Sequence, residues 1–496
     1  MGILAPATDN PVFTGTGRTS LVEQDVDAAT AYAWSALGGA PESAGRVTYV
    51  PAPGVLPSRL PVRQLARASV GVCSLAAAEL VARRSGRAAP AVRVHEAAVG
   101  AAFVSERHLR IDGRTLSPFA PLSSFWPTAD GWVRTHANYP HHRARLLSSL
   151  GIRDDGGDDD SAVCERLADE LRTRTAGWVQ ETVYAAGGLA VAVAEPGTDR
   201  WPLIDSRRVA GGAGRAAARR RGPASASASA SAEGALPAHG VRVLDLTRVI
   251  AGPVATRTLG LLGADVLRVD PPRLPEDPKA HADTGFGKRS TRLDLGARAG
   301  LAVFEELLGS ADVVVLGYRA DALDRYGLAP DTLLERHPGL IVARLDAWGW
   351  TGPWRDRRGF DSLVQAAKGI SLIERGPDGR PGALPAQALD HSTGYLLAAA
   401  ILRALTERRD DGAGRQLRLS LAGTASWLMR DIRPEPASGR AEGDLTETYD
   451  AGAWMAGTPS PYGDLRYVRS PVNYEGGPDD WAGPPSMWGT DPARWL

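Results

Sequence analysis

The sequence predicts an α/β protein that has a Rossmann-like parallel-sheet core and a smaller α+β domain. Two stretches carry this prediction. Residues 241–272, VRVLDLTRVIAGPVATRTLGLLGADVLRVDPP, contain an apolar strand, a Gly-Pro turn, an Ala/Leu-rich helix and a second strand, which together make a βαβ unit. Residues 392–421 contain an apolar helix, a stop at Asp-Asp-Gly and a strand in which polar and apolar side chains alternate. Strands that alternate with helices in this way form parallel sheets.

Composition and pattern divide the chain into six segments. We expect a flexible arm at 1–28, a degenerate core-like segment at 29–115, a small domain at 116–206, a linker at 207–239, the main core at 240–430 and a closing tail at 431–496. The linker is expected because an Arg cluster followed by an Ala-Ser repeat cannot bury a core.

The small domain is expected from short strands that flank amphipathic helices. Its strands begin near Ala129 and Leu189, and its helices are expected at 139–150, at 163–173 and from Thr175 onward. Histidines cluster at its first helix, at positions 136, 141 and 142. No Cys or carboxylate completes a tetrahedral metal set at ligand spacing, so we expect a solvated helix start and no metal site.

An internal repeat links the first segment to the core. Residues 69–103 follow the same helix-turn-strand plan as residues 392–428. Asp390, at the start of the second copy, corresponds to Arg67 or Ala68 in the first, so the first copy has no acid to offer. We therefore expect the first copy to superpose on the second and to pack against it as a structural mate. The small domain is expected to fold back over Asp390.

Composition excludes several classes of protein. The chain has 496 residues, 43% hydrophobic and 23% charged, as in soluble globular proteins, and its net charge is zero. A neutral chain gives no reason to expect nucleic acid or an anionic membrane as partner. Two cysteines without a C-x-x-C pattern indicate a reducing, cytoplasmic location. We find neither a signal peptide nor a long enough apolar run, so no membrane association is expected.

Asp390 is the candidate catalytic residue. It stands just before the apolar helix, where an Asp is most often a helix cap, and His391, Ser392 and Thr393 are also possible caps. The usual interpretation of such an Asp is thus structural. The motifs in the rest of the core favour a catalytic role instead.

Several ordered motifs give the core a family resemblance. After the βαβ unit come GKRS at 287–290, LDRYGL at 323–328, HPGLI at 337–341, WGWTGP at 348–353 and GFD at 359–361. In this order and spacing, residues 240–425 resemble the family III CoA-transferases, the group of formyl-CoA transferase, carnitine CoA-transferase and bile-acid-inducible protein F. The resemblance implies that Asp390 is the catalytic Asp. It also implies a set of CoA-binding residues: Arg248, Ala251, Lys288, Arg325 and Tyr326.

The resemblance implies a definite chemistry. The Asp390 carboxylate would accept an acyl group from a thioester as a mixed anhydride, and CoA would return to give an enzyme-bound thioester. The backbone amides of His391, Ser392 and Gly394 are candidate oxyanion donors. Acyl-CoA and a small carboxylic acid are then the substrates, and no tightly bound cofactor is needed.

Departures from the family pattern leave alternatives open. Residues 317–321 read GYRAD where the family commonly has Asn-Phe-Arg-Pro-Gly, and Pro271 replaces a residue that is often basic. Ile250 stands where formyl-CoA transferases carry Gln, which favours a less polar acyl group. A 2-methylacyl-CoA racemase needs a His where Phe360 stands, so racemisation is disfavoured. A non-catalytic CoA-binding paralogue remains an alternative, and a homodimer and a self-contained pseudo-dimer are both possible.

Overall fold

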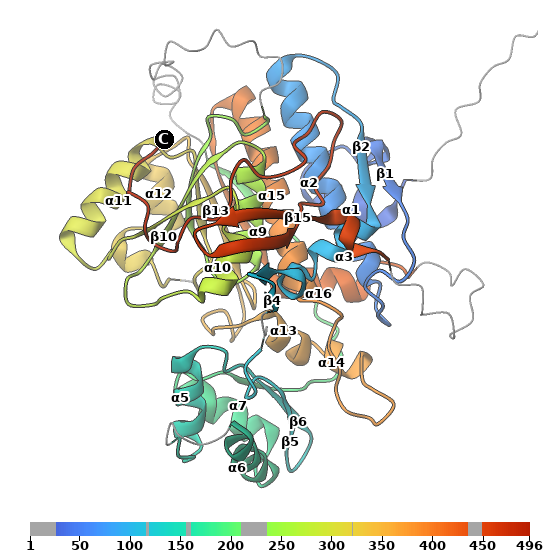
Figure 1. The fold of residues 1–496 in the computed structure, drawn as a ribbon, viewed down its shortest axis with the longest axis vertical. Coiled ribbons are helices and arrows are strands. Elements are labelled where there is room, and N and C mark those ends of the chain that lie inside the picture. Colours follow the sequence, from blue (N-terminus) through green and yellow to red (C-terminus); the bar gives the residue numbers. More distant parts are fainter. Residues whose placement is uncertain (1–25, 116–118, 155–159, 210–235, 320, 435–448) are drawn as a thin grey trace, which may run out of the picture.

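The fold is known from a computed structural model that describes residues 26–115, 119–154, 160–209, 236–319, 321–434 and 449–496 (Figure 1). The expected arm at 1–28 lies almost entirely outside the described residues, and so does most of the expected linker. Residues 207–209 belong to a strand, and Ala238 is buried and donates its N–H to Leu262 O. The expected linker was therefore too long at both ends.

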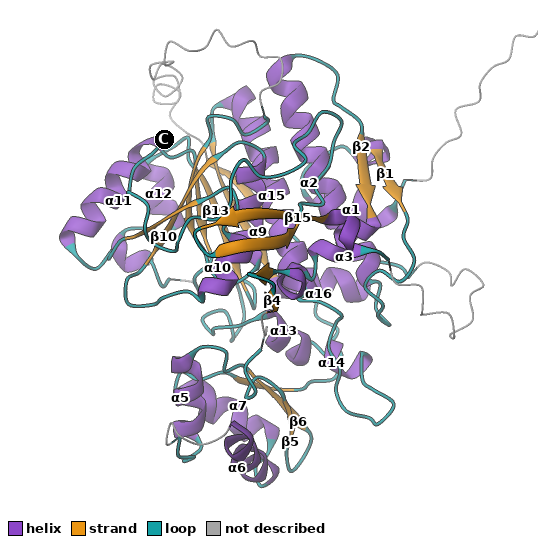
Figure 2. Cartoon of the chain, viewed as in Figure 1, coloured by secondary structure: helices purple, strands orange, loops and turns teal. Residues whose placement is uncertain are grey.

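A seven-stranded sheet forms the core and confirms the predicted fold class (Figures 1 and 2). Its strands lie in the order β11-β10-β9-β12-β13-β14-β8, and all pairs are parallel except the antiparallel pair of β14 and β8. The bounds are β8 Asp205–Val209, β9 Arg242–Leu246, β10 Asp265–Asp270, β11 Arg289–Arg292, β12 Val313–Leu316, β13 Ile341–Asp346 and β14 Gly414–Ser420.

Helices cover both faces of this sheet because successive strand residues point to opposite sides. On β12, Val313 and Val315 pack in the cluster that contains α9 and α15, whereas Val314 and Leu316 pack against α11 and α12. These four helices span Ala251–Leu261 (α9), Ala388–Asp411 (α15), Arg298–Ser310 (α11) and Pro330–Arg336 (α12). From β9 the chain adds β10 and β11 on one side of β9, and it then adds β12 on the other side. A crevice is expected where the neighbouring strands β9 and β12 end.

The N-terminal segment supplies a second long helix that packs along α15 (Figure 1). Helix α2, Val62–Ser85, has 24 residues, as α15 has, and each ends at a left-handed glycine, Gly86 or Gly412. A strand and a helix follow in both copies: β2 (Val92–His95) and α3 (Glu96–Ala102) after α2, β14 and α16 (Leu421–Arg430) after α15. The predicted packing of the two copies is confirmed, and their superposition remains a prediction.

The first turn of α2 has no acidic residue, whereas that of α15 has Asp390. Near the start of α2, Arg67 pairs with Asp27 at 2.5 Å and with the buried Glu96 at 2.9 Å. Ion pairs thus occupy the N-terminal end of the first copy. Helix α2 is the one described helix that is long and apolar enough to cross a membrane, and 78% of its apolar window is buried inside the protein.

The small domain pairs a three-stranded sheet with three helices, below the main core in Figure 1. Its strands are β5 Phe125–Pro127, β6 Trp132–Thr135 and β7 Ala190–Ala192, and its helices are α5 Pro140–Ser149, α6 Asp160–Arg172 and α7 Ala176–Ala185. Buried leucines and valines from all three helices form its separate core.

The C-terminal tail and the N-terminal segment share a four-stranded sheet in the order β15-β16-β3-β4. The bounds are β15 Met455–Ser460, β16 Gly463–Val468, β3 Arg110–Ile111 and β4 Arg114–Thr115. The remaining elements are α1 Ala28–Ala36, η1 Pro41–Arg46, β1 Val47–Val50 (paired with β2), α4 Ser105–His108, α10 Pro278–Thr284, η2 Asp324–Tyr326, α13 Asp361–Ala367, α14 Ile370–Ile373 and η3 Ala451–Trp454.

Candidate active site

A cavity of about 630 Å³ lies where β9, β12 and β13 end. Its wall includes residues at or just after these strand ends, among them Leu246, Gly317 and Ala347. The small domain contributes a further set: Tyr139, His141, His142 and Arg145. The small domain therefore covers the cavity, which is the arrangement expected from the sequence. The volume falls in the range of small-molecule sites in proteins.

Asp390 lines this cavity from the first turn of α15. The sequence placed it in a loop or at the helix entrance; it is the third residue of the helix and only 7% exposed. Within the described residues, no group hydrogen-bonds to its carboxyl. A buried carboxyl that faces a cavity without a protein partner is available to a ligand.

Asp361 holds the start of α15 in place. Its Oδ2 accepts the backbone N–H of Asp390 at 2.9 Å, and its Oδ1 accepts Gln365 Nε2. Gln387, at the N-cap position, makes no capping hydrogen bond with its side chain. The prediction that one of residues 391–393 caps the helix was wrong. The cap comes from Asp361 of α13, which is 29 residues before Asp390 in the sequence.

Burial raises the pKa of three acidic groups near α15. Burial raises the pKa of Asp390 well above its usual value, and the negative charges of Asp361 and Glu106 raise it further. Burial likewise raises the pKa of Asp361 to about 6 and that of Glu106 to about 7. When Asp390 ionises here its carboxylate is poorly solvated, which makes it a stronger nucleophile than an exposed one.

The backbone amides predicted as oxyanion donors are already in use. His391 N donates to Gln387 O at 3.0 Å, and Ser392 and Gly394 lie further inside α15, where each N–H bonds the preceding turn. By contrast, the turn that leads into α9 lines the cavity. Ala251 lines the cavity at the start of α9, and Val249 beside it has a φ of +71°, a strained conformation for a β-branched residue.

Four of the five residues proposed to bind CoA line the same cavity as Asp390. They are Arg248, Ala251, Arg325 and Tyr326. The Arg325 guanidinium carbon lies 4.7 Å from the centre of the Tyr326 ring, so charge and aromatic surface come together in η2. The Arg248 guanidinium is engaged elsewhere, since its Nη1 donates to Leu274 O at 2.5 Å.

Lys288, the fifth, is not among the residues that line this cavity. Its fully buried ammonium donates to Asp245 Oδ2 at 3.1 Å and to Thr256 Oγ1 at 2.7 Å. Burial lowers the pKa of Lys288 to about 8. In this structure Lys288 neutralises a buried aspartate and does not reach the cavity, so the carry-over by motif misplaced it.

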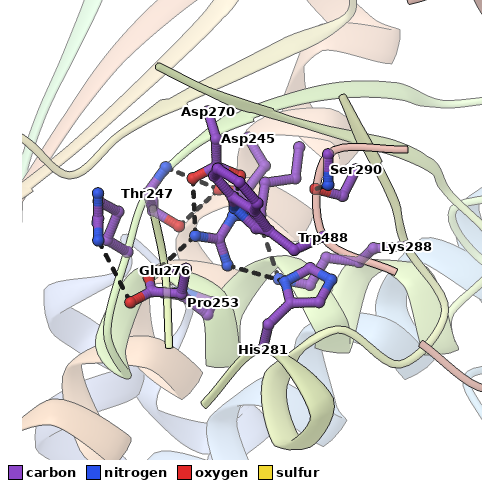
Figure 3. A network of polar contacts seen from close by, with 12 residues as sticks. Asp245, Thr247, Pro253, Asp270, Glu276, His281, Lys288, Ser290 and Trp488 are labelled. Carbon is purple, nitrogen blue, oxygen red and sulfur yellow. Dashed lines mark hydrogen bonds and ion pairs between the residues drawn. The ribbon is translucent and has the colours of Figure 1, made fainter. Parts of the chain in front are cut away.

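Lys288 belongs to a larger buried network that the sequence did not reveal (Figure 3). Arg268 is 1% exposed; its Nη2 donates to Asp270 Oδ1 at 2.9 Å and to Glu276 Oε2 at 3.0 Å. Burial lowers the pKa of His281 to about 3, so this ring is neutral beside Arg268. The only sequence signal was an alternation of apolar and charged residues in β10, VLRVD.

The sequence predicted that the histidines of the small domain are solvated, and this prediction was wrong. His136 and His142 are buried, and burial lowers their pKa values to about 3 and about 2. His136 stacks on Phe360, with ring centres 3.7 Å apart. Across the part of the chain that the structure describes, no three His, Cys, Asp or Glu side chains are grouped so as to hold a metal ion.

Sequence reasoning also missed much of the cavity wall. Besides Tyr318, the missed residues that bear charge or polar groups are Arg145, Arg273, Asp346, Arg319, Arg357 and Arg358. Most follow the carboxyl end of a strand, which is the signal that marks ligand contacts in an open α/β sheet.

Residues 239–456 match the sequence model of CoA-transferase family III. A probable fatty acyl-CoA transferase of Mycobacterium tuberculosis is 35% identical over 208 residues, 39% of this chain and 53% of that protein. A succinate–glutarate CoA-transferase of Agrobacterium fabrum is 34% identical over 212 residues, with the same two coverages.

The beta subunit of a succinyl-CoA–L-malate CoA-transferase of Chloroflexus aurantiacus is 36% identical over 199 residues, 38% of this chain and 49% of that protein. A crystal structure of a hypothetical protein from Mycobacterium tuberculosis has 35% identity and a TM-score of 0.38, over 40% of this chain and 57% of that one. The chain spans about half the length of the curated relatives it matches.

Proposed function

We propose that the chain is a CoA-transferase of family III, whose sequence model residues 239–456 match, and that it moves CoA from an acyl-CoA donor to a carboxylic acid acceptor. One observation carries the proposal: the unpartnered carboxyl of Asp390 shares a cavity with Arg248, Arg325 and Tyr326. Arginines suit the phosphates of CoA, and Tyr326 offers a ring for the adenine.

The proposed reaction uses Asp390 as the nucleophile. Its carboxylate attacks the thioester carbonyl, the C–S bond breaks, and CoA leaves as the thiolate from a mixed anhydride. The thiolate then attacks the Asp390 carbonyl, releases the first acid as its carboxylate and leaves an aspartyl-CoA thioester. The acceptor carboxylate repeats these two exchanges in reverse order and departs as the new acyl-CoA. Every step trades one activated acyl group for another, so no cofactor enters the reaction.

Two features support a self-contained catalyst in a reducing compartment. Helix α2 packs on α15 within one chain, which supports a pseudo-dimer. Cys73 and Cys164 form no disulfide with each other, in keeping with the proposed cytoplasmic location. A racemase is not proposed, because Phe360 lines the cavity where that reaction needs a proton donor.

Trapping the intermediate tests the proposal. The protein is incubated with a panel of acyl-CoAs, treated with hydroxylamine or borohydride, and digested for mass spectrometry. We expect modification at Asp390 and at least a roughly 1,000-fold loss of transfer in Asp390→Asn. The matched control is Asp479→Asn, which removes an exposed carboxyl from the tail.

Near-native turnover by Asp390→Asn would exclude the aspartyl mechanism. CoA binding by calorimetry without turnover on any donor would instead favour the non-catalytic alternative.

A further inference from the structure

A short proline-rich segment lies across one side of the cavity. Residues 271–277, PPRLPED, connect β10 to α10, and Pro271, Arg273 and Leu274 line the cavity. Prolines at 271, 272 and 275 fix much of its backbone, so the segment is stiff. It is not part of the sheet, and side chains from other elements hold it down.

Arg248 is the first of these. Its Nη1 donates to Leu274 O at 2.5 Å and its Nη2 donates to Pro275 O at 2.9 Å. The same Nη2 lies 3.4 Å from Glu276 Oε1. The arginine expected to bind a phosphate is therefore occupied by backbone carbonyls of the segment, which are neutral acceptors and weaker partners than a phosphate.

Glu276 joins the segment to both the small domain and the core, and Figure 3 shows its place in the buried polar network. Tyr139 Oη donates to its Oε1 at 2.9 Å, and Arg268 Nη2 donates to its Oε2 at 3.0 Å. Its side chain is 1% exposed. Burial acts to raise the pKa of Glu276, but Arg268 and Arg248 hold it below its usual value, so the carboxylate is charged at neutral pH.

We propose that residues 271–277 are a lid over the cavity, that Glu276 is its latch, and that Arg248 exchanges the carbonyls of Leu274 and Pro275 for a phosphate of CoA as the ligand enters. The proposal rests on the proposed function, because it takes CoA as the ligand. Opening requires the contacts of Glu276 with Tyr139, Arg248 and Arg268 to break.

Tyr139→Phe tests the latch with the least disturbance. It removes the hydroxyl that bonds Glu276 and keeps the ring, which lies 5.5 Å from the Arg248 guanidinium. Loss of a hydrogen bond to a charged group changes the equilibrium constant between the bonded and unbonded states by about 10-fold or more. The open lid should therefore be about 10-fold more populated in this variant.

Two measurements read out lid opening, with and without ligand. In stopped-flow tryptophan fluorescence with CoA, the observed rate for the wild type should reach a plateau set by lid opening, and Tyr139→Phe should raise that plateau several-fold. Without ligand, trypsin should cut after Arg273 about 10-fold faster in the variant, because cleavage follows the open population. Tyr32→Phe removes an exposed hydroxyl far from the cavity and is the matched control.

A second variant, Glu276→Gln, removes the charge of the latch and should act in the same direction, provided that its melting curve shows it folded. Equal trypsin cleavage rates for the wild type and Tyr139→Phe would refute the lid proposal, whether or not the protein binds CoA. A protein that opens as expected but binds no CoA would leave the lid in place and refute the proposed function.

Discussion

The carboxyl of Asp390 has to satisfy two opposed demands. As the proposed nucleophile it has to lose its proton, yet burial and the charges of Asp361 and Glu106 favour the protonated form. The folded chain therefore holds this proton more tightly than the unfolded chain does. The ionised form, once made, has no hydrogen-bond donor among the described residues, so its lone pairs are available to attack a thioester.

This conflict predicts how stability depends on pH. Below the unfolded pKa of about 4, Asp390 is protonated in both states and costs nothing. From there up to the raised folded pKa, the folded state binds more protons, so stability falls as pH rises. Asp390→Asn should thus melt at a higher temperature than the wild type at pH 8, and the gap should close towards pH 4. Calorimetry at several pH values measures it, and a gap that stayed constant with pH would contradict the assignment.

Truncation of Lys288 should lower stability, whereas truncation of Arg325 should weaken substrate binding. Lys288→Ala leaves Asp245 as a buried, partly unpaired charge, which costs about 3–5 kcal/mol of unfolding free energy. Arg325→Ala removes a cavity side chain and should raise KM for acyl-CoA with little change in kcat, because phosphate contacts persist through the reaction. Urea unfolding and steady-state kinetics of both variants separate the two roles. A higher KM in a fully stable Lys288→Ala would restore its place in the binding site.

At the scale of elements, α15 packs tightly against α9. A Cβ added to Gly394 would lie 2.6 Å from the backbone oxygen of Ala251, closer than atoms can pack. The glycine therefore lets the helix that carries Asp390 lie directly on the helix that begins the cavity wall.

Gly394→Ala should push the two helices apart. We expect a loss of about 1–3 kcal/mol in unfolding free energy, typical of overpacking, together with lower transfer activity as Asp390 moves. Gly309→Ala is the matched control: Gly309 lies in α11 with open space around it, so the same change should stabilise the protein by up to about 1 kcal/mol. Denaturant curves of both variants measure the change in unfolding free energy. Equal changes in the two variants would mean that α15 and α9 are not tightly packed at Gly394.

The elements that local pattern specifies were predictable, and those fixed by distant partners were not. The strands and helix of 241–272 follow from apolar periodicity, and they appear as β9, α9 and β10. The cap of α15 comes from Asp361, and β8 exists because Asp205–Val209 pairs with β14 across the sheet. Neither partner is near in sequence. The same reason explains Lys288, whose motif was visible but whose direction depends on Asp245.

At the scale of the whole molecule, the two halves of the chain share one core. Trp34 and Leu75 belong to the same buried cluster as Leu396 and Trp427. Arg403 of α15 also bonds Glu79 of α2 at 2.6 Å. The interface between the halves is thus built as a protein interior and not as a docked surface.

Cutting the chain between the halves should therefore not separate them. A specific protease site placed within residues 224–231 allows the cut to be made after folding. We expect the two fragments to co-elute as one species in size-exclusion chromatography and to retain the transfer activity of the uncut protein. A control in 1 M salt should give the same elution, because apolar contacts dominate the shared core. Two separate peaks would show that the linker holds the halves together.

The packing of α2 on α15 also bears on how such a chain evolves. Two identical subunits carry every substitution twice, once in each copy, so neither copy is free to change alone. Here each half is encoded separately. The first half has Arg67, Asp27 and Glu96 at the end where the second half has Asp390. Under the proposed mechanism one chain carries one reactive carboxylate, and selection on the first half acts on folding and packing alone.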